Sequence, residues 1–116
     1  LPIYDPIHGH FRLRPVSCAI IDTKPFQRLR RLKQLGFAYY VYPGASHNRF
    51  EHCLGVAHLS GKWTEELMRQ DRFPHEEIER CASLVEIAGL CHDLGHGPFS
   101  HSWEKSVLPA LGVGDW

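Results

Sequence analysis

A helical stripe that ends on a histidine lies in the C-terminal half of the chain. Apolar residues recur there at steps of three and four, the spacing of one helix face: Ile78, Cys81, Val85 and Ala88. The next position on the stripe is His92, and Asp93 follows it directly. The segment LGHGPFSH comes next, and its glycines and proline end the helix before a short amphipathic piece near Phe99. The sequence therefore predicts a helix end that carries a histidine and a carboxylate side by side.

A second long helix is predicted from about His47 to Gln70. Pro43-Gly44 marks a turn before it, and Ser46 is a suitable N-cap. Gly55 and Gly61 lie inside this helix, where each costs about 1 kcal/mol relative to alanine. We therefore expect close packing to require both glycines.

The N-terminal part is predicted as an arm followed by one helix. Residues 1–15 contain the turn signal Asp5-Pro6 and a strand-like alternation, which favours a short β-hairpin or an extended arm. A helix is then predicted from Asp22 or Thr23 to Gly36, with a buried stripe at Phe26, Leu29, Leu32 and Leu35. Its other face is basic, with Arg28, Arg30, Arg31 and Lys33. The predicted fold class is all-α, with an arm at 1–21 and a helical core at 22–116.

The bulk composition limits the classes of function. With 116 residues, 43% of them hydrophobic, the chain is long enough for one compact domain. A formal net charge of zero gives no global field that would attract nucleic acid or an anionic membrane. No apolar run approaches the roughly 20 residues that cross a bilayer, so we expect a soluble protein with no membrane partner. The cysteines form no CxxC pair, so free thiols and an intracellular place, nucleus or cytoplasm, are expected.

Histidine is unusually frequent, with nine residues in the chain. His52, His92 and Asp93 offer imidazole nitrogens and a carboxylate oxygen, which suit zinc, iron or manganese at about 2 Å. Neighbours on a regular helix point about 100° apart, so both members of the His-Asp pair reach one ion only at a broken helix end, which Gly95 supplies. A lone histidine on an apolar stripe is more often a hydrogen-bonded core residue. The second histidine-rich helix and the LGHGPFSH segment favour the metal site.

Two blocks, PGASHNRFEH and IAGLCHDLGHGPFSH, resemble the signature blocks of the HD-domain deoxynucleoside triphosphate triphosphohydrolases. The resemblance extends through DPIHGH, IIDTKPFQRLR and KQLG, and it is greatest to the vertebrate branch that joins a SAM domain to the HD domain. It implies an all-helical HD domain in which His52, His92 and Asp93 bind the metal. The fourth ligand of the family, a distant aspartate, would lie outside this chain, because Asp115 comes too early. Residues 1–116 are thus expected to be a partial HD domain, truncated at the C-terminus and inactive alone.

The resemblance also implies a set of catalytic residues. His96 and His101 correspond to histidines beside the scissile phosphate, where an imidazole can protonate the leaving oxygen. Glu104 stands where the family usually has aspartate, which keeps the charge but moves it by one methylene.

Substrate-binding residues are implied in the same way. Arg49 matches an arginine that holds the triphosphate, a task suited to a guanidinium. Gln34 and Leu35 match residues that read the 3′-hydroxyl and crowd the 2′-position of the sugar.

A regulatory nucleotide site is the last implication of the resemblance. Asp22, Gln27 and Arg30 correspond to contacts of an activating guanine nucleotide, GTP or dGTP, and Tyr40 and Val41 to a neighbouring deoxynucleotide site. Tyr4 and Tyr42 belong to the second site but differ from the usual asparagine and phenylalanine. Magnesium would accompany the nucleotides, and nucleotides would drive tetramer formation. Taken alone, Asp22 is a helix cap and Arg30 part of a solvated basic face.

The predicted function is metal-assisted hydrolysis of a deoxynucleoside triphosphate to the deoxynucleoside and inorganic triphosphate. One alternative is a non-catalytic nucleotide or single-stranded nucleic-acid module that uses the basic residues 28–33 and the aromatic run 37–42. A second alternative is an HD phosphodiesterase with another class of substrate.

Overall fold

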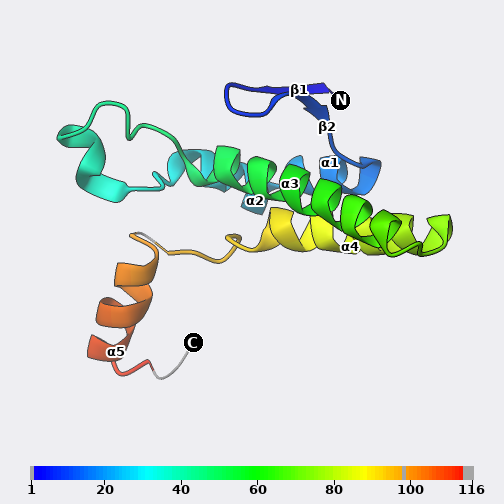
Figure 1. Cartoon of the computed structure of the whole chain (residues 1–116). Coiled ribbons are helices and arrows are strands. Elements are labelled where there is room, and N and C mark those ends of the chain that lie inside the picture. Colours follow the sequence, from blue (N-terminus) through cyan, green and yellow to red (C-terminus); the bar gives the residue numbers. More distant parts are fainter. Residues whose placement is uncertain (1, 98, 114–116) are drawn as a thin grey trace.

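Two long antiparallel helices form the axis of the molecule (Figure 1). The computed structural model describes residues 2–97 and 99–113, so Asp115 lies outside the described residues. Helix α3 spans Arg49–Gln70 and helix α4 spans His75–Cys91, with a turn at 71–74 between them. Both helices lie where the sequence predicts them.

The N-cap of α3 is Asn48, not the predicted Ser46. The Asn48 side chain accepts a hydrogen bond from the backbone N–H of Glu51 (3.3 Å) and donates one to the Glu51 carboxylate (2.8 Å). The first of these bonds is an N-cap, which satisfies one backbone donor that the first turn leaves free, and the second holds the two side chains together. A consequence of this N-cap is that Arg49 and His52 lie within the first turn of α3.

The buried face of α4 is displaced from the predicted stripe. The fully packed positions recur at steps of four: Ile78, Ala82, Glu86 and Leu90. Val85, expected inside, is 39% exposed, and His92 lies at the surface. The prediction was wrong here because Glu86 is a charged residue in the packed face, where it accepts hydrogen bonds from Arg14 and Ser17.

Glycines allow the close approach of α3 to its neighbours, as predicted. A Cβ added at Gly61 would lie 3.2 Å from Oε2 of Glu86, and one at Gly55 would lie 3.0 Å from Nε2 of His8. Gly89 on α4 is tighter still, because an added Cβ would lie 2.7 Å from Oγ of Ser60 on α3.

The predicted N-terminal hairpin is present. Strands β1 (Pro2–Asp5) and β2 (Gly9–Arg12) pair antiparallel. In the turn between them, Oδ1 of Asp5 accepts hydrogen bonds from the backbone N–H groups of Ile7 and His8. Helix α1 (Pro15–Ile21) follows, so the predicted arm at 1–21 contains a helix that the sequence reading did not foresee.

The helix predicted from 22 to 36 is wrong in its second half. Helix α2 covers only Lys24–Arg28, followed by a 3₁₀ turn at Leu29–Arg31. Residues 32–34 are instead drawn into backbone pairing with 47–49: the N–H of Arg49 donates to Leu32 (2.9 Å), and the N–H of Gln34 donates to His47 (3.2 Å). Leu35 is consequently 54% exposed instead of buried.

Beyond the long helices, the chain forms two smaller segments. A second 3₁₀ helix covers Gly36–Tyr40, and after α4 a π-helical turn at Trp103–Val107 leads into α5 (Leu108–Ala110). Figure 1 shows both segments at the same end of the α3–α4 pair. The core beside that end contains Phe26, Leu29, Phe50, Cys53 and Leu90.

All four cysteines are free, as expected. Among residues 2–97 and 99–113, no helix is long and apolar enough to cross a membrane.

Candidate metal centre

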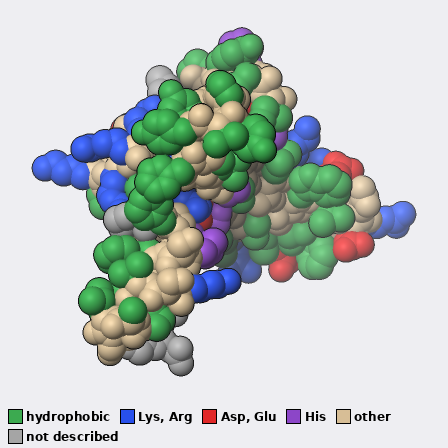
Figure 2. Space-filling model, turned by 90° about the vertical axis from the view of Figure 1, so that its left-hand side faces the viewer, with side chains coloured by type: hydrophobic (Ala, Val, Ile, Leu, Met, Phe, Trp, Pro, Cys, Tyr) green, Lys and Arg blue, Asp and Glu red, His purple; other side chains and the backbone are tan. Residues whose placement is uncertain are grey.

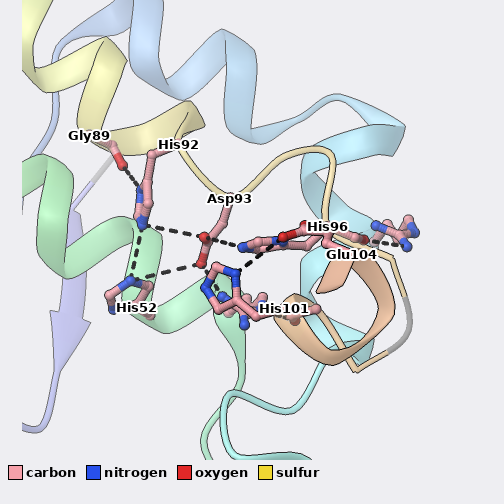
Figure 3. Close-up of polar contacts among 10 residues, drawn as sticks. His52, Gly89, His92, Asp93, His96, His101 and Glu104 are labelled. Atoms are coloured by element: carbon pink, nitrogen blue, oxygen red, sulfur yellow. Dashed lines mark hydrogen bonds and ion pairs between the residues drawn. The ribbon is translucent and has the colours of Figure 1, made fainter. Parts of the chain in front are cut away.

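His52, His92 and Asp93 converge at the end of the α3–α4 pair (Figure 3). Nε2 of His52 lies 3.1 Å from Nε2 of His92. The same Nε2 of His92 lies 3.5 Å from Oδ1 of Asp93. Oδ2 of Asp93 lies 3.8 Å from Nε2 of His52. Two atoms that bind one ion at about 2.1 Å are separated by roughly 3 to 3.5 Å. The three side chains therefore fit a shared divalent cation.

The end of α4 presents His92 in the tautomer that a metal ligand needs. Nδ1 of His92 lies 2.7 Å from the carbonyl oxygen of Gly89, one turn earlier in the helix. A carbonyl can only accept, so Nδ1 carries the proton and Nε2 keeps its lone pair toward His52. The helix ends at Cys91 with His92 as its C-cap, which lets Asp93 turn toward the same point. The predicted helix end is thus confirmed.

Asp93 is buried and strongly paired. Nη1 of Arg49 donates to Oδ2 of Asp93 (2.6 Å), and Nε2 of His96 lies 3.1 Å from Oδ1. Burial acts to raise the pKa of Asp93, but the Arg49 guanidinium outweighs burial, and the pKa falls below its usual value. Burial also lowers the pKa of His52, which favours the neutral ring that ligates metals. A charged carboxylate and neutral imidazoles are the donor forms that a divalent cation requires.

A second cluster adjoins the first and joins His96, His101 and Glu104. Nδ1 of His96 lies 2.6 Å from Oε1 of Glu104, and Nδ1 of His101 lies 3.1 Å from Oε2. The hydrogen bond from His96 is the main cause of a lowered pKa of Glu104. Each oxygen of this carboxylate therefore contacts a different histidine. The side chain of Glu104, one methylene longer than that of aspartate, reaches both rings.

The turn that carries these histidines is held by Arg49 and by two residues that the sequence did not assign to the site, Ser100 and Arg28. Nε of Arg49 donates to Oγ of buried Ser100 (2.9 Å), and Arg28 donates to the carbonyl of His96 (2.9 Å). Phe99 and Ser100 have positive φ angles, 62° and 49°, which cost side-chain-bearing residues about 1–2 kcal/mol each. Ser100 lies in the signature block, which is a usable signal, whereas Arg28 looked like one cation of a solvated face.

A pocket of about 690 Å³ opens beside the candidate metal ligands. Arg49 and His101 line it, together with Gln34 and Leu35, so four of the predicted catalytic and substrate residues share one cavity. Oε1 of Gln34 is buried and has no hydrogen-bond partner within the described residues. Figure 2 shows histidine side chains in a recess between hydrophobic side chains. His52, His92 and Asp93 are not among the lining residues, but Arg49, which lines the pocket, is bonded to Asp93.

The residues predicted to bind regulatory nucleotides are only partly brought together. Nε of Arg30 donates to Oε1 of Gln27 (2.8 Å), and its guanidinium lies 3.6 Å from the centre of the Phe50 ring. Asp22 is exposed as the C-cap of α1, not the N-cap of the following helix. Tyr40 and Val41 are exposed on the 3₁₀ segment, at 79% and 71%. The ring of Tyr4, on β1, lies 4.9 Å from that of His10 at an angle of 53°, and Tyr42 is exposed.

Comparison with known proteins decides the family. The HD domain family matches residues 49–112, more than half of the chain, and this range includes both clusters. The chain belongs to the HD-domain family. The chain is 57% identical, over 92% of its length, to the deoxynucleoside triphosphate triphosphohydrolase SAMHD1 of Bos taurus and to that of Homo sapiens. It is 53% identical, over 90% of the chain, to a SAMHD1 homolog of Dictyostelium discoideum.

The HD-domain chain spans a small part of each of these relatives. It covers 18% of the bovine protein, 17% of the human protein and 20% of the Dictyostelium protein. The family expected from the two signature blocks is confirmed, and so is a mainly helical fold that carries an N-terminal hairpin.

Proposed function

We propose that this chain supplies the metal-binding and phosphate-binding part of a phosphohydrolase that cleaves deoxynucleoside triphosphates to the deoxynucleoside and inorganic triphosphate. The observation that carries the proposal is the convergence of His52, His92 and Asp93 beside a pocket with an arginine in its wall. The names of the relatives support the substrate class.

The three side chains would hold a zinc, iron or manganese ion, all of which accept histidine and carboxylate ligands. A divalent ion in this place lowers the pKa of a bound water and polarises a phosphate oxygen. We propose that a fourth ligand, an aspartate, comes from outside residues 1–116. The chain alone would then bind metal weakly and turn over no substrate, because affinity depends on complete ligation.

His101 is the better candidate for the general acid. It lines the pocket, and its Nδ1 proton is directed to Glu104, which leaves Nε2 facing away from that carboxylate. A charged His101 gives its Nε2 proton to the leaving 5′-oxygen of the nucleoside, and the negative charge of Glu104 stabilises the charged ring before transfer. Both ring nitrogens of His96 face carboxylates instead, so His96 serves to position Glu104 and Asp93.

Arg49 and Gln34 would position the substrate. Arg49 lies in the pocket wall with its guanidinium already on Asp93, where it offsets the charge of a phosphate placed between the two clusters. The buried Oε1 of Gln34 needs a donor, and the 3′-hydroxyl of a deoxyribose is one. Leu35, exposed in the same pocket, would crowd the 2′-position.

Regulation is the finer part of the proposal. Asp22, Gln27 and Arg30 would contact a guanine nucleotide with its magnesium ion, and Tyr40 and Val41 a second deoxynucleotide. The contact between Gln27 and Arg30 and the exposure of Tyr40 and Val41 support such surfaces. Binding at these surfaces would favour a homotetramer of the full-length protein.

The nucleic-acid alternative receives less support. Of its basic residues, Arg28 is bonded to His96, Arg30 to Gln27, and Lys33 to the carbonyl of Ser46 (2.6 Å). The fourth, Arg31, lines the pocket. The formal net charge of zero gives no global field that would attract a nucleic-acid backbone. Product analysis separates the remaining alternative, a phosphodiesterase of another substrate class.

The test is substitution of the metal ligands in the full-length protein. His92→Ala and Asp93→Ala are expected to abolish bound metal, measured by elemental analysis, together with triphosphate release. His75→Ala, an exposed histidine at the start of α4, is the matched control and should retain both. Full metal content and turnover in His92→Ala would contradict the proposal. The binding-module alternative would be favoured if the unaltered protein shows no turnover and His92→Ala keeps the same nucleic-acid affinity as the unaltered protein.

A further inference from the structure

Two phenylalanines stand exposed at the pocket beside the metal centre. Phe37 is 67% exposed on the 3₁₀ helix Gly36–Tyr40, and Phe99 is 57% exposed on the turn after α4. Their ring centres lie 5.0 Å apart at an interplanar angle of 44°, and both residues line the pocket. The ring of Phe37 also approaches that of Tyr40, at 6.1 Å between ring centres. Rings that contact each other while remaining open to solvent form a continuous apolar surface.

The position of Phe99 is imposed by its surroundings. Its left-handed backbone is unfavourable for a phenylalanine, and the neighbouring Ser100 shares that conformation. The hydrogen bond from buried Arg49 to Oγ of Ser100 holds the turn, and contact with Phe37 holds the ring. The strained backbone therefore directs the apolar side chain of Phe99 toward the pocket and away from the core.

Polar groups around the same pocket indicate what the rings face. Arg31 and Arg49 supply positive charge, and Gln34 has a buried oxygen that lacks a donor. A ligand that matches this wall carries negative charge, a hydroxyl group and a flat apolar surface. A nucleoside triphosphate has all three, in phosphates, sugar and base, whereas inorganic triphosphate lacks the last two.

We infer that Phe37 and Phe99 form a stacking platform for the base of the nucleoside triphosphate. The inference rests on the proposed function and adds to it a determinant of base recognition. The platform offers no hydrogen-bond donors or acceptors from its side chains, so it accepts any base and favours the larger ring area of purines. Recognition through ring area alone predicts a preference for purines over pyrimidines without strict selection of one base.

The test compares Phe37→Ala with Trp63→Ala in the full-length protein. Trp63 is a matched control because it is 62% exposed on α3 and does not line the pocket. Phe37→Ala is expected to raise KM for dGTP roughly tenfold, the usual effect of losing one stacking side chain. The effect on dCTP should be smaller, inhibition by inorganic triphosphate should be unchanged, and Phe37→Tyr, which keeps the ring, should restore KM.

Two results would overturn the platform. One is the same KM for dGTP in Phe37→Ala and Trp63→Ala, and the other is an equal loss of affinity for dGTP and inorganic triphosphate, which would show a distorted phosphate site. If the unaltered protein releases no triphosphate, the proposed function fails and the platform is judged by equilibrium binding of dGTP. Equal dGTP affinity of Phe37→Ala and the unaltered protein would then reject it.

Discussion

Asp93 contacts an arginine and three histidines of the site. It contacts Arg49 through one oxygen and His96 through the other, and both oxygens also approach the histidines of the metal cluster. The pKa of Asp93 is lowered although burial opposes this, because the guanidinium of Arg49 is so close. The carboxylate is thus held charged and in place before any ion binds, which limits the reorganisation that ligation requires.

Glu104 offers the most direct residue-level prediction. Glu104→Gln removes the negative charge that orients His96 and His101, while the metal ligands keep their contacts. We expect kcat for triphosphate release to fall by about 100-fold, the lower end of what a positioned general acid contributes. KM and metal content should stay unchanged.

The matched control for Glu104→Gln is Glu66→Gln on α3. Glu66 is an exposed carboxylate whose bonds within the described residues go to Arg69 and Gln70 on its own helix. An undiminished kcat in Glu104→Gln, measured beside this control, would rule out the role assigned to Glu104.

Much of the site was readable from the residues because the ligands lie within two short blocks. His52, His92 and Asp93 came together as predicted, since a broken helix end leaves few other directions for the last two side chains. The contact of Arg28 with His96 was not readable, because it joins positions 68 residues apart and one arginine on a basic face resembles another.

At the scale of elements, the contact between α3 and α4 sets the position of the site. An alanine methyl at Gly89 would lie 2.7 Å from Oγ of Ser60 and 3.2 Å from a methyl group of Val56. The hydroxyl of Ser60 is itself bonded to the carbonyls of Ala57 and Val85, so it has little freedom to move. Gly89 also supplies the carbonyl that accepts from His92.

Gly89→Ala is therefore expected to lower the free energy of unfolding by about 1–3 kcal/mol, the usual cost of overpacking a tight contact. Gly44→Ala is the control, because an added Cβ there meets nothing within 4 Å and the backbone is not left-handed. Thermal or denaturant unfolding of the two variants measures the difference. Equal stability of Gly89→Ala and Gly44→Ala would contradict the close contact of α3 with α4.

The elements could be predicted only where local signals decide them. The hairpin and the two long helices carry their own turn signals and periodicity, and they were found. The helix expected at 22–36 ends early because residues 32–34 bond to 47–49, a contact that no local pattern contains. The buried stripe of α4 was misplaced for a related reason: Glu86 is buried by its pairing with Arg14, which counting apolar residues cannot detect.

At the scale of the whole molecule, the fold brings two signature blocks of an HD domain together at one end of a helix pair. The block around His52 begins α3, and the block around His92 ends α4, so the antiparallel arrangement places both at the same end (Figure 1). The 3₁₀ segment and the turn after α4 supply the pocket beside them. The residues that we propose for metal ligation, phosphate binding and proton donation thus lie in one region, on the start of α3, the end of α4 and the turn after it.

We propose that this region directs hydrolysis to the bond between the 5′-oxygen and the α-phosphate, whose cleavage releases inorganic triphosphate. Incubating the full-length protein with dGTP and resolving the phosphate products by chromatography tests it most directly. Attack at the α-phosphate with departure of the 5′-oxygen predicts deoxyguanosine and inorganic triphosphate in equal amounts from the first turnover, with no dGDP and no pyrophosphate. Stepwise appearance of orthophosphate with dGDP and dGMP would contradict the account.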